Sequence, residues 1–290
     1  MTNTNQPPNA LPLGHVLCPT DLSPISLNAL EWANAVARAR NAELKTLHVV
    51  ATEGIVAPDG LGAMDRQNMM GALRRTLHSI DPANPRVGAA IRQGDPGIEI
   101  LQFARLMPAG LIVIGAAGIE RPERPSGSII STVVARSDCP VMIVPSGRQV
   151  NEHRDGFFEH IVCAVDLTPI SVPVMRQALS LAWETHGRVT MVCVMTEPNP
   201  PSSDIQQLVL DAIPPEAASW CDIDIVVTRG VPATEIVKAA ESPGVDLLVI
   251  GPPRRWTSTT QAVLAKSLCP VLVTHDARPL PYPPVTRSML

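Results

Sequence analysis

A glycine-rich segment in the first half of the chain has the residue types and spacing to bind a ligand. It reads Gly115-Ala-Ala-Gly118 and, after eight further residues, Gly127-Ser128-Ile129, where a helical pattern begins. Glycines let the backbone come close to a ligand, and the first turn of a helix presents free N–H groups and a positive dipole end. The Ser128 hydroxyl adds a donor. Such a segment is suited to holding an oligophosphate.

Two better-known phosphate loops do not match this segment. The chain has no Gly-Lys-Ser or Gly-Lys-Thr, as a Walker A loop requires, and the segment lacks the compact Gly-x-Gly-x-x-Gly dinucleotide fingerprint. A glycine-rich turn between a strand and a helix also occurs in α/β proteins that bind no nucleotide. The loop alone therefore leaves a purely structural interpretation open.

Two further candidates follow apolar runs earlier in the chain. Asp21 comes directly after the first run, and Val49 lies at the end of the second. Ligands of open parallel sheets bind beyond the carboxyl ends of the strands, where the strand order reverses. We therefore expect Asp21 and Val49 to converge with the glycine segment. Asp21 could instead cap the helix that begins two residues later, and Asp166 could do the same in the second half.

Short apolar runs alternate with longer helical stretches, and this pattern must position the candidates. The expected strands of the first half are residues 16–19, 44–50, 86–92, 111–115 and 141–144. They are β-branched and continuous, as strands buried on both faces are. The expected helices begin at Ser23-Pro24 and cover residues 67–80, 97–107 and 128–137. This alternation predicts an α/β fold whose mostly parallel sheet is covered by helices on both faces.

The same pattern occurs twice in the 290 residues. Residues 15–26 recur as residues 160–171, with an offset of 145, and Cys139-Pro-Val recurs as Cys269-Pro-Val. A chain of this length fits two domains. We predict domains at 13–147 and 158–277, a polar linker over 146–158, and tails without chemistry at 1–12 and 278–290. We also predict that the final strands, 141–144 and 271–274, meet at the junction, since each would otherwise leave an apolar sheet edge.

Composition excludes several classes of partner. A net charge of −4 provides no basic surface for duplex DNA, and eight aromatic residues are too few for base-stacking platforms, so we expect no nucleic-acid partner. The longest apolar stretch, residues 110–119, falls short of the roughly 20 residues that span a membrane. We therefore expect no transmembrane segment and no membrane partner. The first basic residue is Arg38, which is atypical of a secretory signal and favours a cytoplasmic location.

The six cysteines and the histidines predict structure rather than chemistry. The chain has no Cys-x-x-Cys pair and no histidine spaced to complete a metal site, so we expect reduced, mostly buried thiols and no metal. His15 and His160 begin strands without a partner carboxylate, and His48 lies inside an apolar run where Cys193 stands in the second half. We interpret all three histidines as structural.

Several of these motifs together resemble the universal stress protein family. They are the strand-end Asp21-x-Ser23, the Leu47-His48-Val49 strand, the glycine segment and the closing Cys-Pro-Val-Met-Ile-Val. The resemblance covers both halves, from about residue 14 to 274. It implies two tandem domains, each a five-stranded parallel α/β sandwich of the adenine nucleotide alpha-hydrolase-like type, related by a pseudo-two-fold axis.

The resemblance also implies a ligand, since some family members bind ATP through this loop. Asp21 and Val49 would face the adenine and ribose, with Pro19 beside them as a further cofactor-binding candidate. The residues that would line the phosphates are Gly115, Gly118, Gly127, Ser128 and Ile129. The first half departs from the family pattern in having eight residues rather than nine between Gly118 and Gly127.

The second half departs further from the pattern. Gly251-Pro-Pro-Arg254 replaces the paired glycines, and the segment that follows is about half as long as in the first half. Prolines remove N–H donors and a short loop cannot surround a triphosphate. We therefore expect at most one ATP, in the first half.

Three functions remain open on the sequence. The first is a stress-response, nucleotide-responsive binding protein without enzymatic activity beyond slow, incidental ATP hydrolysis, which signals to an unknown protein partner as a homodimer or an intrachain pseudo-dimer. The second is a scaffold or interaction protein that binds no nucleotide. The third, an adenylate-transfer enzyme, lacks the His-x-Gly-His type of motif expected for it, and no nucleophile, base and orienting group can be assembled from the motifs.

Overall fold

The computed structural model describes residues 13–51, 62–82, 86–116, 129–150, 158–183, 185–196, 201–219, 221–252 and 258–274. Its strands are β1 (His15–Pro19), β2 (Glu43–Ala51), β3 (Val87–Gly94), β4 (Leu111–Gly115), β5 (Val141–Val144), β6 (His160–Val165), β7 (Arg188–Met195), β8 (Asp222–Arg229), β9 (Leu247–Ile250) and β10 (Val271–Val273). Its α-helices are α1 (Pro24–Ala39), α2 (Ala63–Ile80), α3 (Pro96–Leu106), α4 (Ile129–Arg136), α5 (Ser171–Trp183), α6 (Ser202–Ala212), α7 (Pro232–Ala240) and α8 (Ser258–Lys266), with a short 3-10 helix at Pro215–Ser219.

The elements expected from the apolar pattern are present, and local signals account for their limits. Ser23 caps α1 by accepting the Ser26 backbone N–H, and Pro24 occupies the first turn, where a missing N–H costs nothing. Asp95 caps α3 in the same way, with Pro96 after it. Helix α2 begins at Ala63, before the predicted residue 67, and the apolar pattern missed its first turn because Met64, Asp65 and Arg66 are exposed.

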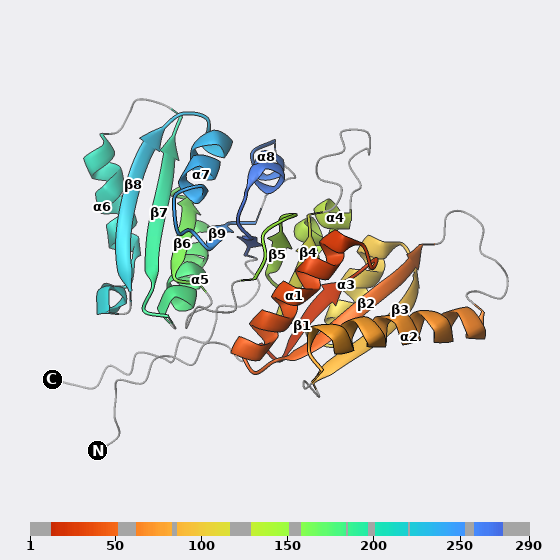
Figure 1. Ribbon diagram of the computed structural model, residues 1–290. Helices are drawn as coiled ribbons and strands as arrows, with labels where there is room; N and C mark the ends of the chain where they lie inside the picture. Colours follow the sequence, from red (N-terminus) through yellow and green to blue (C-terminus); the bar gives the residue numbers. More distant parts are fainter. Residues whose placement is uncertain are drawn as a thin grey trace, which may run out of the picture.

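All ten strands form one sheet in the order β3-β2-β1-β4-β5-β10-β9-β6-β7-β8 (Figure 1). Strands are parallel within each half, as predicted. The order reverses between β1 and β4 in the first half and between β6 and β9 in the second. The mirrored order of the two halves confirms the pseudo-symmetric α/β architecture, and it places the two crossover points in equivalent positions.

The halves join through their final strands. Strands β5 and β10 pair antiparallel, with Val271 opposite Ile143, Leu272 opposite Met142 and Val273 opposite Val141. This pairing confirms the predicted junction and fuses two five-stranded sheets into one. Apolar edges are removed from water where each half alone would expose them.

The interpretation of residues 146–158 as a simple polar linker is wrong at two described positions. Phe158 is only 5% exposed and belongs to the core on one face of the sheet, and Val150 packs against the same core. Both side chains are apolar, and their burial contributes favourably to folding. The predicted tails, residues 1–12 and 278–290, lie outside the described residues.

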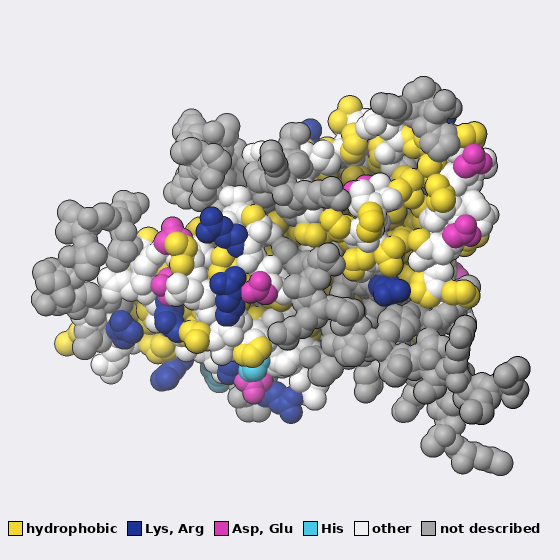
Figure 2. All heavy atoms as spheres, turned by 180° about the vertical axis from the view of Figure 1, so that it is seen from behind, with side chains coloured by type: hydrophobic (Ala, Val, Ile, Leu, Met, Phe, Trp, Pro, Cys, Tyr) yellow, Lys and Arg dark blue, Asp and Glu magenta, His cyan; other side chains and the backbone are white. Residues whose placement is uncertain are grey.

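Helices cover both faces of the sheet and bury aliphatic rather than aromatic cores. Trp32 of α1 and Met175 of α5 lie in the cluster on one face, whereas Ile100 of α3 and Ile236 of α7 lie in the cluster on the other. Seen from behind, the first half displays a group of Lys and Arg side chains, whereas apolar side chains dominate the second half (Figure 2). On this face the two halves differ in the side chains that they expose.

Candidate functional site

The crossover between β1 and β4 gathers the described candidates at one edge of the sheet. Pro19 ends β1 and pairs with Leu47 of β2, and Gly115 ends the neighbouring strand β4. Val49 follows Leu47 by two residues, so its side chain points to the same face of the sheet as that of Leu47. Asp21 lies just beyond β1. The structure therefore places these four candidates at the carboxyl edge, where ligands of open α/β sheets bind.

The Asp21 carboxylate is exposed and held by the backbone. Its Oδ1 accepts the N–H of Ser23 at 3.0 Å, and Ser23 in turn caps α1. Partial burial raises the pKa of the Asp21 carboxyl, but hydrogen bonds from Ser23 and Ser26 outweigh it and lower the pKa below its ordinary value. Asp21 is consequently an ionised acceptor whose orientation is fixed by hydrogen bonds, at the carboxyl edge of the sheet beside the crossover.

The turn that presents Asp21 is strained in both halves. Leu22 has φ of 64° and its counterpart Leu167 has φ of 59°, which is the left-handed region that disfavours side chains with a Cβ. Such a residue costs about 1–3 kcal/mol and persists only where its surroundings determine it. In the first half the Leu22 N–H donates to Thr20 Oγ1 at 3.0 Å. The repetition shows that this turn is a shared feature of the two crossovers.

Thr20 is a site residue that the sequence reasoning missed. Its hydroxyl is buried and lies 2.9 Å from Ser26 Oγ, while the Ser26 hydroxyl also donates to the Ser23 carbonyl at 3.0 Å. These bonds connect the end of β1 to the first turn of α1. The signal for Thr20 was present as a polar residue directly after an apolar run, in the same stretch as Asp21.

The equivalent carboxylate of the second half is also exposed and accepts hydrogen bonds from its own turn. Asp166 Oδ1 accepts the Thr168 N–H at 3.0 Å, the Thr168 hydroxyl at 2.7 Å and the Ser171 hydroxyl at 2.6 Å. Val165 replaces Thr20 at the end of the strand, so the threonine hydroxyl that contacts Ser26 in the first half has no counterpart in the second. The backbone N–H that Asp166 accepts belongs to Thr168, before α5 begins at Ser171, so these contacts hold the turn and do not cap the helix as the capping interpretation expected.

The packing of α1 against β4 explains why position 115 is a glycine. A Cβ added there would lie 2.7 Å from the carbonyl oxygen of Ile25, in the first turn of α1. Gly115 is therefore needed for the close approach of α1 to the end of β4. At Gly251, its counterpart, the nearest atom would be the Val174 Cγ2 at 3.3 Å, which is a looser fit.

The remaining phosphate candidates are described only in part. Gly118, Gly127 and Ser128 lie outside the described residues. Ile129 is the first residue of α4 and is 40% exposed. The first turn of α4 accordingly starts where the sequence predicted.

The histidines have contacts that explain them structurally. His48 Nδ1 lies 2.8 Å from the Thr20 carbonyl oxygen, and His160 Nε2 lies 3.0 Å from Thr190 Oγ1. The expectation that His15 has no partner carboxylate is wrong, because the β1–β2 register places it opposite Glu43, 3.6 Å away. Burial, together with the charge of Arg188, lowers the pKa of His160.

Cysteines and acids in the described segments form no group of three that could hold a metal ion. All six cysteines are free, and Cys193, at the place of His48, is buried. Burial raises the pKa of Cys163 to about 12 and, with the charge of Asp222, that of Cys221 to about 11. No helix in the described part of the chain is long and apolar enough to cross a membrane.

The duplication seen in the fold is matched by the comparison with known families. The sequence profile of the universal stress protein family matches residues 12–145 and, a second time, residues 157–275. This chain belongs to the universal stress protein family. A universal stress protein of Methanocaldococcus jannaschii is 28% identical over 136 residues, which are 44% of this chain and 80% of that protein. That relative therefore corresponds to one half of the present universal stress protein.

Two solved structures share the whole two-half arrangement. A universal stress protein of Archaeoglobus fulgidus is similar with a TM-score of 0.70 and 19% identity, over 90% of this chain and 96% of that one. A Pseudomonas aeruginosa protein described as a universal stress protein has a TM-score of 0.61 and 16% identity, over 91% and 93% of the chains. These similarities confirm the tandem universal stress protein fold.

Proposed function

We propose that this universal stress protein is a cytoplasmic stress-response protein that binds one adenine nucleotide, ATP, in its first half and signals through protein association. The observation that carries the proposal is the longer interval between strand and helix at the first crossover, which extends from Gly115 to Ile129 in the first half but only from Ile250 to Ser258 in the second. Asp21 is an exposed, ionised acceptor at the same crossover. An exposed carboxylate at a crossover suits the hydroxyl groups of a ribose, since ionised oxygens accept several hydrogen bonds.

The described residues fit one end of such a ligand. Pro19 and Val49 supply apolar surface beside Asp21 at the carboxyl edge, which suits an adenine ring. The first turn of α4 at Ile129 offers backbone N–H groups for phosphate. Ile25 lies in the direction of the missing Cβ of Gly115, and the Gly115 backbone at the end of β4 stays a proposed phosphate contact. Gly118, Gly127 and Ser128 remain the proposed phosphate residues.

The second half lacks room for the same ligand. Strand β9 ends at Ile250 and α8 begins at Ser258, whereas the corresponding interval in the first half extends from Gly115 to Ile129. Pro252 and Pro253 contribute no N–H donors to this short segment. We propose that ATP binds in the first half alone, in a domain over residues 13–147, with the second domain over 158–277.

Binding without catalysis is the form of activity that we propose. His48 Nδ1 lies within hydrogen-bond distance of the Thr20 carbonyl oxygen. Burial raises the pKa of Cys18 and Cys163, which keeps their thiols protonated. The free thiols also support a reducing, cytoplasmic location. The β5–β10 pairing supports an intrachain pseudo-dimer as the unit that meets a protein partner.

A scaffold that binds no nucleotide is the second candidate. The close contact between Gly115 and Ile25 favours it, because packing alone then accounts for the first glycine of the loop. The two candidates differ in a single measurable property, which is whether the purified protein holds an adenine nucleotide.

The duplication provides a matched test. ATP titration followed by calorimetry should give a stoichiometry near one, and adenine nucleotide should be released when freshly purified protein is denatured. Asp21→Ala should weaken binding by about tenfold or more, since it removes hydrogen bonds to an ionised group. Asp166→Ala is the control, because it changes the equivalent residue of the other half and should leave affinity unchanged. Equal effects of the two variants, or a stoichiometry near two, would contradict the assignment, and the absence of binding would favour the scaffold.

A further inference from the structure

The segment that leaves β5 is held by one face of α1. Asn28 Nδ2 donates to the Pro145 carbonyl at 3.3 Å, and Trp32 Nε1 donates to the Arg148 carbonyl at 2.8 Å. Asn28 and Trp32 are four residues apart, so they lie above one another on the same side of the helix. Trp32 is only 4% exposed. The backbone position of Arg148 is therefore set by a buried side chain of the first half.

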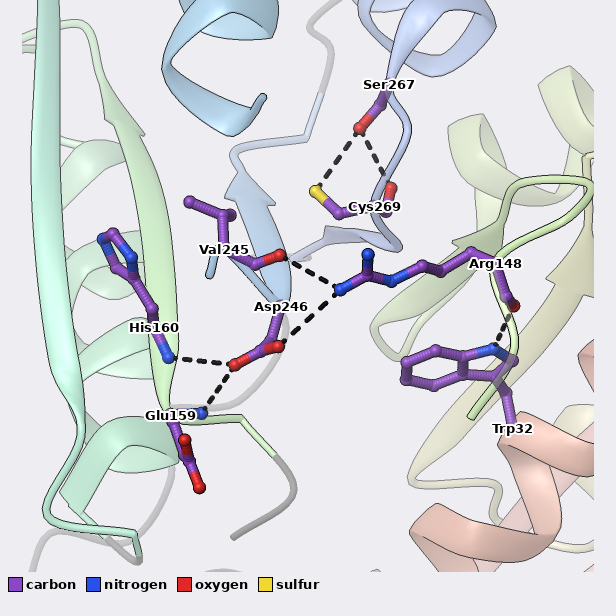
Figure 3. A network of polar contacts seen from close by, with 8 residues as sticks. All are labelled: Trp32, Arg148, Glu159, His160, Val245, Asp246, Ser267 and Cys269. Atoms are coloured by element: carbon purple, nitrogen blue, oxygen red, sulfur yellow. Dashed lines mark hydrogen bonds and ion pairs between the residues drawn. The ribbon is translucent and has the colours of Figure 1, made fainter. Parts of the chain in front are cut away.

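The Arg148 side chain extends from this anchor into the second half (Figure 3). Its Nη2 donates to the Val245 carbonyl at 3.4 Å and lies 3.8 Å from Asp246 Oδ1. The Asp246 side chain is 9% exposed. A nearly buried carboxylate requires a partner, because removing a charge from water is costly unless it is paired.

Asp246 holds the beginning of the second sheet. Its Oδ2 accepts the backbone N–H groups of Glu159 and His160, at 3.1 and 3.2 Å, directly where β6 starts. Its own backbone N–H donates to the His160 carbonyl at 2.9 Å. One carboxylate thus connects the start of β6, the start of β9 and, through Arg148, helix α1 of the other half.

This network is absent from the symmetric position. Gly110, which has no side chain, precedes β4 where Asp246 precedes β9, and Gln177 stands in α5 where Trp32 stands in α1. Duplication of an ancestral half therefore does not account for the network. Its contacts lie at the junction, beside the three residue pairs that join β5 to β10.

We propose that Arg148 is an inter-half clasp that fixes the orientation of the two halves and makes them unfold as one cooperative unit. Trp32 positions its backbone, and Val245 and Asp246 receive its guanidinium. The three pairs of β5 and β10 and the apolar clusters on the two faces of the sheet join the halves, and the clasp adds a polar attachment that restrains their rotation. The inference stands on junction contacts alone and is independent of nucleotide binding.

Native-state hydrogen exchange in increasing urea tests the clasp. In the unaltered full chain, peptides from β1 and β4 should exchange through the same opening as peptides from β6 and β9, because the halves open together. Arg148→Met keeps the apolar stem but removes the guanidinium. Its two sets of peptides should then separate by about tenfold in exchange rate, since hydrogen bonds from charged groups contribute free energies of that order.

Arg105→Met is the matched control. It removes an arginine that lies 2.7 Å from Asp138 within the first half and should leave the two sets of peptides together. Asp246→Asn keeps an oxygen for Glu159 and His160 but loses the charge, so adding it to Arg148→Met should change exchange less than it does alone. Coincident exchange in Arg148→Met, separate openings in the unaltered protein, or additive effects in the double variant would each overturn the proposal.

Discussion

Ser171 donates its hydroxyl hydrogen to Asp166 Oδ1 at 2.6 Å, across the turn between β6 and α5. Ser26, the counterpart of Ser171, lies 2.9 Å from Thr20 Oγ1 and also hydrogen-bonds Asp21. The replacement of Thr20 by Val165 thus removes one partner of this serine, whereas the contact with the aspartate is kept in both halves. This contact makes the stability of the second half sensitive to pH.

Ser171→Ala should reduce stability at neutral pH and flatten its dependence on acid. Partial burial raises the pKa of Asp166, but hydrogen bonds from Ser171 and Thr168 outweigh it and lower that pKa. A carboxyl whose pKa is lowered by folding stabilises the native state above its unfolded pKa of about 3.9, and this contribution disappears as pH falls through the lower folded pKa. Urea unfolding at pH 7 should show a loss of about 1 kcal/mol, a modest value because the carboxylate is partly solvated.

The difference between variant and parent should shrink as the pH is lowered below about 4. Ser79→Ala provides the comparison, since its hydroxyl donates to the Thr76 carbonyl at 2.7 Å, which is a neutral acceptor. A loss that is the same at pH 7 and at pH 2.5 would show that Ser171 acts by packing alone.

Gly115→Ala should destabilise the protein by about 1–3 kcal/mol. The new Cβ would approach the Ile25 carbonyl oxygen to 2.7 Å, so backbone must shift to admit it. Gly251→Ala is the matched control, because its Cβ would meet the end of the Val174 side chain at 3.3 Å. Thermal unfolding of both variants decides the matter, and equal losses would remove the packing explanation of Gly115.

The thiols should be inert in the folded protein, and reductant should leave the melting temperature unchanged. Burial raises the pKa of Cys163 to about 12, so its thiolate, the reactive form, is scarce at neutral pH. The order of reaction with a thiol reagent should place Cys139, which is partly exposed, before Cys18 and Cys163. Rapid labelling of all six sites without denaturant, or a melting temperature that drops on reduction, would count against this view.

Separately produced halves should self-associate or aggregate. Residues 1–157 end beyond β5 and residues 158–290 contain β10, and each strand loses its partner across the junction when the chain is divided. Both strands are apolar and fully buried, so an unpaired edge of this kind invites pairing with another copy. Analytical ultracentrifugation measures the outcome, and two monomeric, soluble halves would contradict it.

The arrangement of strands and helices could be predicted from the sequence because each depends on neighbouring residues. Buried parallel strands require continuous apolar runs. The Ser23-Pro24 pair predicts the start of α1 from the cap and first-turn residues alone. The repeat at an offset of 145 predicted two domains for the same reason, since equal patterns fold alike. Four candidate residues lie at one edge because the carboxyl ends of parallel strands lie at the same edge of a sheet. They are Pro19, Asp21, Val49 and Gly115.

Side-chain partners that are distant in the chain could not be predicted in this way. Apolar periodicity does not predict that Gly115 packs against the Ile25 carbonyl or that Glu43 lies beside His15. Both contacts depend on the packing of separate elements. Arg148 belonged to a segment expected to be a polar linker, and its contacts with Val245 and Asp246 exist only after β5 and β10 have paired. The sequence by itself determined the duplicated α/β fold and the sheet edge at which the candidate residues meet, because local periodicity and strand order decide both. Only the tertiary structure decided which side chains hold the junction beside the final strands, because the contacts of Arg148 with Val245 and Asp246 form between residues that folding alone brings together.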